Sequence, residues 1–231
     1  MSSEESLPTV ADPPGFDFEV LECNALSATQ REEILGLFEM NYRNADPAFL
    51  DKSLGRLRHI AIAYRDGVTA GFGIAESRVM DLPRLPDQVV MLAGLCCVAP
   101  NHRRQGLFRK LENLAAAVTR LPETPRRLFC GRMAHPAALR SITRFAEVVP
   151  APGVRPTPLQ QETGEVIAKA YGVFDFDPET FVCIGSGQPI GVPNIEFEVE
   201  PHEWEVFEPV DRNRGDALLA LAWIPTSPPD W

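Results

Sequence analysis

A short basic turn between two apolar segments carries the residues best suited to bind a charged ligand. It covers residues 101–108, Asn-His-Arg-Arg-Gln-Gly-Leu-Phe, and follows an apolar run that ends in Val98-Ala99-Pro100. If a helix begins at this turn, its first N–H groups have no intrahelical acceptors and its dipole favours negative charge there. A glycine permits close approach of the backbone, and arginines add positive charge. The turn therefore predicts a binding site for an anion such as a diphosphate.

The distribution of charged residues along the chain supports an anion at this turn. The chain has 32 acidic residues and 22 lysines and arginines, so its net charge is -10. Between Asp87 and Glu112 there is no acidic residue. The basic residues in that interval include Arg103, Arg104, Arg109 and Lys110. This local reversal of sign indicates an anionic ligand rather than a generally basic surface.

Hydrophobic periodicity and turn signals predict the strands and helices that lead to the turn. Ser27 and Gln30 form a capping box, and Asp66-Gly67 is a hairpin turn signal. The expected elements are a strand over 16–21, a helix over 28–43, a short helix after Pro47, strands over 59–64 and 68–80, a loop over 81–87 and a central strand over 88–98. The central strand is apolar at nearly every residue, as expected when both faces of a sheet are covered.

After the turn the pattern predicts further helices and strands. A helix from Leu107 to near Pro122 carries an apolar stripe that includes Val118. The other expected elements are a strand over 127–133, a helix from Pro136 with Phe145 facing inward, a helix from the Thr157–Gln160 capping box to about Tyr171, and strands over 181–184, 195–199 and 217–223. We expect the last of these strands to rejoin the sheet.

Composition places the chain among soluble globular proteins. Its 231 residues are 45% hydrophobic and 23% charged. No run of about 18 apolar residues predicts a transmembrane helix, and the polar, acidic start is not typical of a secretory signal. An acidic chain is poorly suited to nucleic acid or to anionic membranes. These observations favour a cytoplasmic protein.

The cysteines and histidines predict neither a disulfide framework nor a metal site. Five cysteines are an odd number, and they lack framework spacing, which indicates reduced thiols in the cytoplasm. Cys96 and Cys97 are adjacent in the central strand and should point to opposite faces. The four histidines are scattered, and Cys130 with His135 is an isolated pair, so no metal is expected.

The turn and the strand before it resemble the signature of the GNAT superfamily of acyl-CoA-dependent N-acetyltransferases. That motif has the form Arg/Gln-x-x-Gly-x-Gly/Ala after a strand ending in Val-x-Pro. Arg103-x-x-Gly106 and Val98-Ala99-Pro100 fit it, whereas Phe108 replaces the last small residue. The resemblance implies an α+β fold with a central mixed, largely antiparallel sheet flanked by helices. After a loose tail over 1–15, it implies one domain over 16–231, with a core over 16–150 and a C-terminal elaboration over 151–231.

The resemblance implies acetyl-CoA or another acyl-CoA as co-substrate and a small-molecule amine as acceptor. The pantetheine arm would run beside the central strand, and the pyrophosphate would lie on amides of the turn, where a side chain at Gly106 would block its approach. Phe108 is expected to turn into the core between helix and sheet. The cofactor-binding residues implied are Cys96, Cys97, Val98, Arg103, Arg104, Gln105, Gly106, Leu107, Phe108 and Arg109.

Acyl transfer to an amine also needs groups that move protons, and here the sequence departs from the family. The amine must lose a proton and the leaving thiolate must gain one. The family's usual carboxylate is missing from the central strand, and its usual tyrosine is missing from residues 135–145. The remaining candidates are Glu76, as a base acting through water, and His135, with Ser141 nearby. A solvent-facing glutamate and a helix-capping histidine are the structural alternatives.

Two further interpretations remain open at this stage. Cys96 or Cys97 is a candidate nucleophile, although a buried neutral thiol usually behaves as a small hydrophobe. Tyr42 either lines the acceptor pocket, which is expected around residues 40–55 and the C-terminal third, or packs in the core. The leading hypothesis is an N-acetyltransferase that works by direct attack. The alternatives are a non-catalytic CoA-binding module and a GNAT-fold enzyme that hydrolyses or decarboxylates a thioester; a homodimer is also open.

Overall fold

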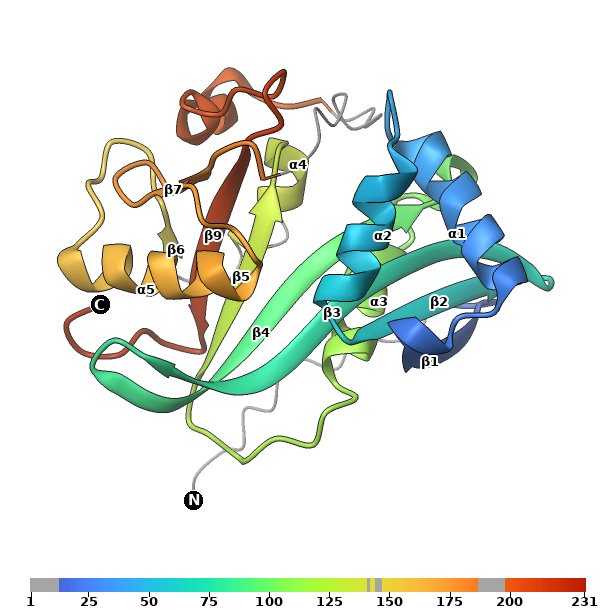
Figure 1. Ribbon diagram of the computed structural model, residues 1–231, viewed down its shortest axis with the longest axis horizontal. Helices are drawn as coiled ribbons and strands as arrows, with labels where there is room; N and C mark the ends of the chain where they lie inside the picture. The colour runs from blue at the N-terminus through green and yellow to red at the C-terminus, as the bar shows by residue number, and fades with distance from the viewer. Residues whose placement is uncertain (1–12, 141, 144–146, 187–197) are drawn as a thin grey trace.

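The computed structural model describes residues 13–140, 142–143, 147–186 and 198–231. These residues form a mixed sheet of nine strands with helices on both faces (Figure 1). The strand order is β1-β2-β3-β4-β5-β9-β8-β7, and β6 pairs with β9. Only β4 and β5 pair in parallel within this described part, so the sheet is largely antiparallel, as predicted. Of the tail expected over 1–15, residues 1–12 lie outside the described residues.

The first part of the chain builds the antiparallel side of the sheet. Its elements are β1 (Asp17–Glu22), η1 (Cys23–Ala25), α1 (Ala28–Asn41), α2 (Pro47–Arg56), β2 (His59–Arg65), β3 (Val68–Leu82) and β4 (Leu85–Val98). The capping box at α1 is confirmed, because the Gln30 amide donates to Ser27 Oγ at 3.2 Å and the Ser27 amide donates to Gln30 Oε1 at 3.0 Å. The hairpin turn at residues 66–67 is confirmed as well.

The loop predicted over residues 81–87 is wrong. β3 continues to Leu82 and β4 begins at Leu85, and these two residues pair, so only Pro83 and Arg84 form the turn. Arg84 adopts a positive φ of 60°, which a tight turn of this kind requires. Pro86 fits near the start of β4 because a proline at the beginning of a strand removes no interior ladder bond. The prolines in this segment led to a predicted loop that is longer than the observed turn.

The second part of the chain adds the remaining strands and shorter helices. Its elements are η2 (Pro100–His102), α3 (Leu107–Ala116), β5 (Arg127–Met133), α4 (Pro136–Leu139), β6 (Val148–Val149), α5 (Pro158–Ala170), β7 (Phe176–Asp177), β8 (Val182–Cys183), η3 (Pro201–Phe207) and β9 (Ala217–Ile224). The predicted strand over 127–133, the second capping box and the return of the last strand to the sheet are confirmed.

Several predicted boundaries in this part are wrong. α3 ends at Ala116 rather than near Pro122, and Val118 is 47% exposed outside the helix. The β-branched Val118 and Thr119 are weak helix formers, which explains the early end. α4 is a single turn, and Phe145 lies outside the described residues. The strand predicted over 181–184 is reduced to β8, and residues 198–199 of another predicted strand are not in a strand.

The helices cover the two faces of the sheet in separate groups. α1, α2 and α5 lie on one face, in front of the sheet in Figure 1, and α3 lies behind it. Strand β9 is buried along almost its whole length because both of its faces are covered. Leu219, Leu221 and Trp223 pack with the first group, whereas Leu218 and Ala220 pack with Phe207 of η3 on the other face.

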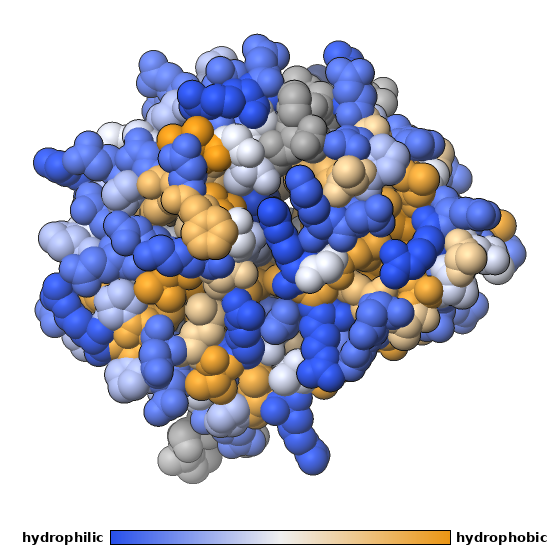
Figure 2. Space-filling model, in the orientation of Figure 1, coloured by the Kyte–Doolittle hydropathy of each residue, from blue (hydrophilic) through white to orange (hydrophobic). Residues whose placement is uncertain are grey.

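The surface of the first face is mixed in polarity. Figure 2 shows apolar side chains on it in separate patches divided by hydrophilic ones. In the part of the chain that the structure describes, no helix is both long and apolar enough to span a membrane.

Strands β4 and β5 diverge in the middle of the sheet. Their parallel pairing runs only from Val90–Leu128 to Ala93–Gly131, while β4 continues to Val98 in contact with β3. The β3–β4 register shifts between the Ala75–Ala93 and Gly73–Cys96 pairs, so β4 bulges by one residue there. Beyond Ala93, the edge of β4 that faces β5 pairs with no strand of the described residues.

Candidate active site

A cavity of about 160 Å³ opens where β4 and β5 diverge. Its walls include residues 93–96 of β4 and, from β5, Phe129 and residues 131–133. Tyr42 and Phe49 contribute from the side of α1 and α2, within the region where the sequence predicts the acceptor pocket. Phe108 contributes from α3 on the opposite face. The cavity is therefore lined from both faces of the sheet, through the gap between the two strands.

The three β4 residues predicted to contact the cofactor lie at this gap but point in different directions. Cys96 lines the cavity, and its thiol donates to the Phe108 carbonyl oxygen with a sulfur–oxygen distance of 3.8 Å. Cys97 packs into the core below α1 and α2, whereas Cys96 and Val98 pack on the α3 side. The prediction that the adjacent cysteines face opposite ways is confirmed. Burial raises the pKa of both thiols, so neither is suited to act as a nucleophile.

The turn before α3 has the backbone conformation of an anion site. Gly106 is the N-cap of α3 with φ of 81°, and Arg104 also has a positive φ, of 66°. No side chain caps α3, so the N–H groups of its first turn keep their capacity to bind an anion. A Cβ placed on Gly106 would meet no atom within 4 Å. Glycine is required here by the backbone conformation, and the space beside it is open.

The side chains of the turn are held in different ways. Arg103 donates from Nη2 to Asn41 Oδ1 at 3.1 Å, which ties the turn to the end of α1, and Gln105 donates to the Asn101 carbonyl oxygen at 3.4 Å. Arg104 is exposed and Arg109 is half-buried. Leu107, the first residue of α3, is buried. The charge of Arg103 therefore lies between the turn and α1.

Phe108 occupies the position at which the family motif has a small residue. Its half-buried side chain packs against the cluster between α3 and the sheet, as the sequence predicts. It also forms part of the cavity wall beside Cys96. The larger side chain thus narrows the cavity on its α3 side.

The structure places the two predicted catalytic residues differently. His135 lines the cavity, but its Nδ1 accepts from the Ala137 amide at 3.1 Å and its ring packs edge-to-face on Trp204 at 5.1 Å. Burial, helped by the charges of two nearby arginines, lowers the pKa of His135, so the ring is a neutral helix cap with its proton on Nε2. This geometry favours the structural role.

Glu76 does not line the cavity. Its Oε2 accepts from the Arg58 amide at 3.2 Å, and its Oε1 lies 3.8 Å from Arg78 Nη1. Its catalytic role stays a prediction without support from this geometry. Ser141 lies outside the described residues. Tyr42 both forms part of the cavity wall and packs against the core.

Glu112 is a candidate functional residue that the sequence reasoning missed. It lies on α3, four residues after Phe108, where it lines the cavity and is only 6% exposed. Burial raises the pKa of its carboxyl group to about 8. A Cβ on Gly73 would come within 2.9 Å of Leu111 Cβ, so this glycine lets α3 lie close against β3. The signal in the sequence is a glutamate one turn after Phe108 in an amphipathic helix.

Tyr171, at the end of α5, is the second residue that was missed. Its hydroxyl lies 2.8 Å from the Ala93 carbonyl oxygen and 2.9 Å from the Cys130 carbonyl oxygen. Burial raises its pKa well above 10, so the hydroxyl stays a donor. Its ring lies under the Arg132 guanidinium, 5.1 Å from the guanidinium carbon. Within the described residues, no group of three potential ligands is placed to hold a metal ion.

The strand order, the parallel β4–β5 pair that opens into a cavity and the turn at the start of α3 define a GNAT fold. The fold predicted from the sequence resemblance is thereby confirmed. No protein-family model matches the sequence, and no curated protein matches it either.

Three solved structures that are similar in fold are distant in sequence. An aminoglycoside acetyltransferase from an uncultured soil metagenomic sample is 20% identical, with a TM-score of 0.31 over 43% of this chain and 66% of that one, just under two thirds of its length. A diaminobutyrate acetyltransferase from Paenibacillus lautus is 17% identical, with a TM-score of 0.32 over 55% and 69%. A ribosomal-protein alanine N-acetyltransferase from Escherichia coli is 13% identical, with a TM-score of 0.39 over 93% and 99%. All three TM-scores are below 0.5.

Proposed function

We propose that this protein is an acyl-CoA-dependent N-acyltransferase that transfers an acetyl group to an amine of a small molecule. The observation that carries the proposal is the edge of β4 beyond Ala93, which borders the cavity and leaves backbone groups directed at the gap. An amide-containing chain such as pantetheine can pair with such an edge as a strand would. The uncapped start of α3 at Gly106 follows the same strand and suits the diphosphate.

Acetyl-CoA, when bound, would supply the thioester that an amine attacks. The chain's own groups must then accept the proton of the amine and stabilise the developing oxyanion. Residues 94 and 95 lie in the β4 bulge and line the cavity, so their backbone N–H groups are the candidates to donate to the oxyanion. Glu112 is the carboxyl group in the cavity wall with a pKa near 8, close to neutral pH, as an efficient general base requires. We therefore propose Glu112, rather than Glu76, as the proton acceptor.

Binding of the co-substrate is tested first. Thermal unfolding and calorimetry with acetyl-CoA should show binding, and a ligand at 100 times its Kd stabilises a protein by about 2.7 kcal/mol. Gly106→Asp should abolish the effect because a carboxylate would occupy the helix N-terminus, whereas the fold should persist because an added Cβ meets no atom within 4 Å and aspartate tolerates a left-handed conformation better than most residues. Gly153→Asp is the matched control, since Gly153 also has a positive φ and open space around it. Equal binding by both variants would overturn the proposal.

Catalysis is tested by release of the CoA thiol with a panel of amines. Glu112→Gln should lower kcat by about 100-fold or more and remove an inflection near pH 8, without weakening acetyl-CoA binding. Glu76→Gln tests the alternative base predicted from the sequence. Binding without thiol release would instead indicate a CoA-binding module, and thiol release without any amine would indicate a thioesterase or decarboxylase.

A further inference from the structure

Two arginines line the cavity on the face that carries α2 and α5. Arg132 lies on β5 in the same alternation as Leu128 and Cys130, which pack with the α1, α2 and α5 cluster. Arg56 is the last residue of α2, and its Nε lies 3.6 Å from where a Cβ on Gly172 would be. Both arginines are part of the cavity wall. Positive charge thus gathers on the side opposite α3.

Arg132 is held in a fixed orientation with part of its guanidinium unused. Its Nη1 donates to Ser186 Oγ at 3.1 Å, and the guanidinium lies over the ring of Tyr171. Its buried Nε has no hydrogen-bond partner among the described residues. Burial lowers the pKa of Arg132, and the charge of Arg56 adds to this effect. Both arginines are half-buried, and in the described part of the chain neither forms an ion pair. A partly desolvated guanidinium without an anion is unfavourable.

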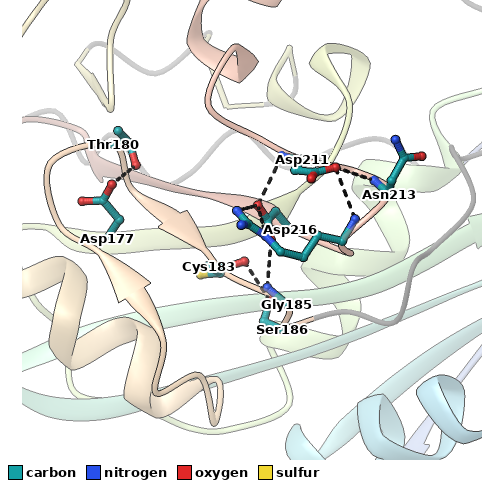
Figure 3. Close-up of polar contacts among 9 residues, drawn as sticks. Asp177, Thr180, Cys183, Gly185, Ser186, Asp211, Asn213 and Asp216 are labelled. Atoms are coloured by element: carbon teal, nitrogen blue, oxygen red, sulfur yellow. Dashed lines mark hydrogen bonds and ion pairs between the residues drawn. The ribbon is translucent and has the colours of Figure 1, made fainter.

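The residue before Ser186, Gly185, is held by a buried carboxylate (Figure 3). Asp216, only 2% exposed, accepts from the Gly185 amide at 2.8 Å, and Arg214 donates to both of its oxygens. Ser186 Oγ lies 3.4 Å from the Cys183 carbonyl oxygen, to which it donates, so its lone pairs are left to accept from Arg132. The turn directly after β8, which contains Gly185 and Ser186, therefore fixes the orientation of Arg132.

We infer that the acceptor carries a carboxylate beside its amine, as an amino acid does, and that Arg56 and Arg132 bind this carboxylate. The inference rests on the proposed function, because it names the acceptor of that reaction. Guanidinium groups bind carboxylates through paired N–H donors, and the side chains of Arg56 and Arg132 both line the cavity. A cavity of about 160 Å³ suits a small molecule of this kind. A polycationic amine would be repelled by the two arginines despite the net charge of -10.

The test compares amino acids with their carboxamides as acceptors for the full-length protein. With acetyl-CoA present, replacing the carboxylate by a carboxamide should lower kcat/KM by about 10- to 100-fold, as expected for lost charge-assisted hydrogen bonds. Arg132→Gln and Arg56→Gln should each raise KM for the amino acid by a similar factor and leave acetyl-CoA binding unchanged. Arg127→Gln, an exposed arginine on the same strand, should have no effect. O-phosphoethanolamine carries a phosphate instead of a carboxylate near its amine, so it tests whether the two arginines bind a phosphate better than a carboxylate.

The outcomes separate this inference from the proposed function. Turnover that is equal for amino acids and carboxamides, or faster for O-phosphoethanolamine, overturns the carboxylate inference and leaves the acyltransferase in place. If acetyl-CoA does not bind, the proposed function fails, and calorimetry with the amino acids alone then decides the inference. If the parent protein binds an amino acid and Arg132→Gln does not, a carboxylate site is supported. If the parent protein binds no amino acid, the inference is overturned too.

Discussion

The hydroxyl oxygen of Tyr171 lies 2.8 Å from the carbonyl oxygen of Ala93, the last residue of β4 that pairs with β5. The same hydroxyl lies 2.9 Å from the carbonyl oxygen of Cys130 on β5. One hydroxyl proton therefore serves two carbonyls, one on each strand, at the point where the strands diverge. Tyr171 thus fixes the end of the parallel pair and, with it, the mouth of the cavity.

Tyr171→Phe should lower the free energy of unfolding by about 1–3 kcal/mol, because two buried carbonyls would lose their donor. Urea denaturation measures the change. Tyr64→Phe is the matched control: the Tyr64 hydroxyl donates to Glu19 Oε2 at 3.0 Å near the surface, where water can replace it. A loss of less than about 1 kcal/mol is expected there. Equal losses in the two variants would show that the Tyr171 hydroxyl does not hold the strands.

Gly106→Ala should destabilise the protein by about 1–2 kcal/mol through its backbone conformation alone. The φ of 81° is unfavourable for alanine, while the added Cβ would meet no atom within 4 Å. Gly36→Ala is the opposite case, because Gly36 lies inside α1 with equally open space and should stabilise the protein by about 0.5–1 kcal/mol. Thermal or urea unfolding compares the two. A Gly106→Ala protein as stable as the parent would contradict the left-handed conformation.

Features of the fold that depend on local chemistry could be predicted from the sequence. The capping boxes at Ser27 and Thr157 fix helix starts within a few residues, and Asp66-Gly67 fixes a turn by its backbone preference. The turn before α3, which we propose binds an anion, is of the same kind, because Gly106 is needed for the conformation of a single residue. In each case the signal and the structure lie within a few residues of each other.

The cavity could not be predicted in this way because its walls come from distant parts of the chain. Tyr171 and Ala93 are 78 residues apart, and nothing near Tyr171 distinguishes it from any aromatic residue at a helix end. Glu112 could not be identified as a cavity residue from the sequence. Helical periodicity shows that it lies beside the apolar stripe of α3, but it does not show that two strands diverge beneath it. Strands were expected over 181–184 and 217–223, but neither sequence shows that β8 pairs with β9.

Asp216→Asn should lower the free energy of unfolding by about 2 kcal/mol at pH 7. Burial alone would raise the pKa of Asp216, but hydrogen bonds from Arg214 and from the Gly185 and Asp211 amides outweigh it and hold the pKa below 3.8. The carboxylate therefore stabilises the fold above the unfolded pKa near 3.8, and this contribution is lost as the pH falls through the lower folded value. Unfolding curves at pH 7, 4 and 3 should show that the difference in free energy of unfolding between parent and variant becomes smaller as the pH falls.

The matched control for this prediction is Asp66→Asn. Asp66 has a side chain 93% exposed in the β2–β3 turn, with φ of 52° that asparagine also accepts. Its substitution should change stability by less than about 0.5 kcal/mol at any of these pH values. A gap for Asp216→Asn that stays constant from pH 7 to 3 would contradict a carboxylate with a lowered pKa.

Glu112 should make the protein less stable as the pH rises toward 8. Its carboxyl has a pKa of about 8 when folded, against 4.5 as the ordinary value, so between these values the folded state holds a proton that the unfolded state has lost. Stability attributable to this proton falls with increasing pH, by at most about 1.4 kcal/mol per pH unit, and levels off above pH 8. Glu112→Gln removes the titration, so the variant should gain on the parent between pH 5.5 and 8 and gain nothing further at pH 9. Urea unfolding of both proteins at these pH values measures the difference, and parallel pH profiles would show that Glu112 titrates as an ordinary surface carboxylate.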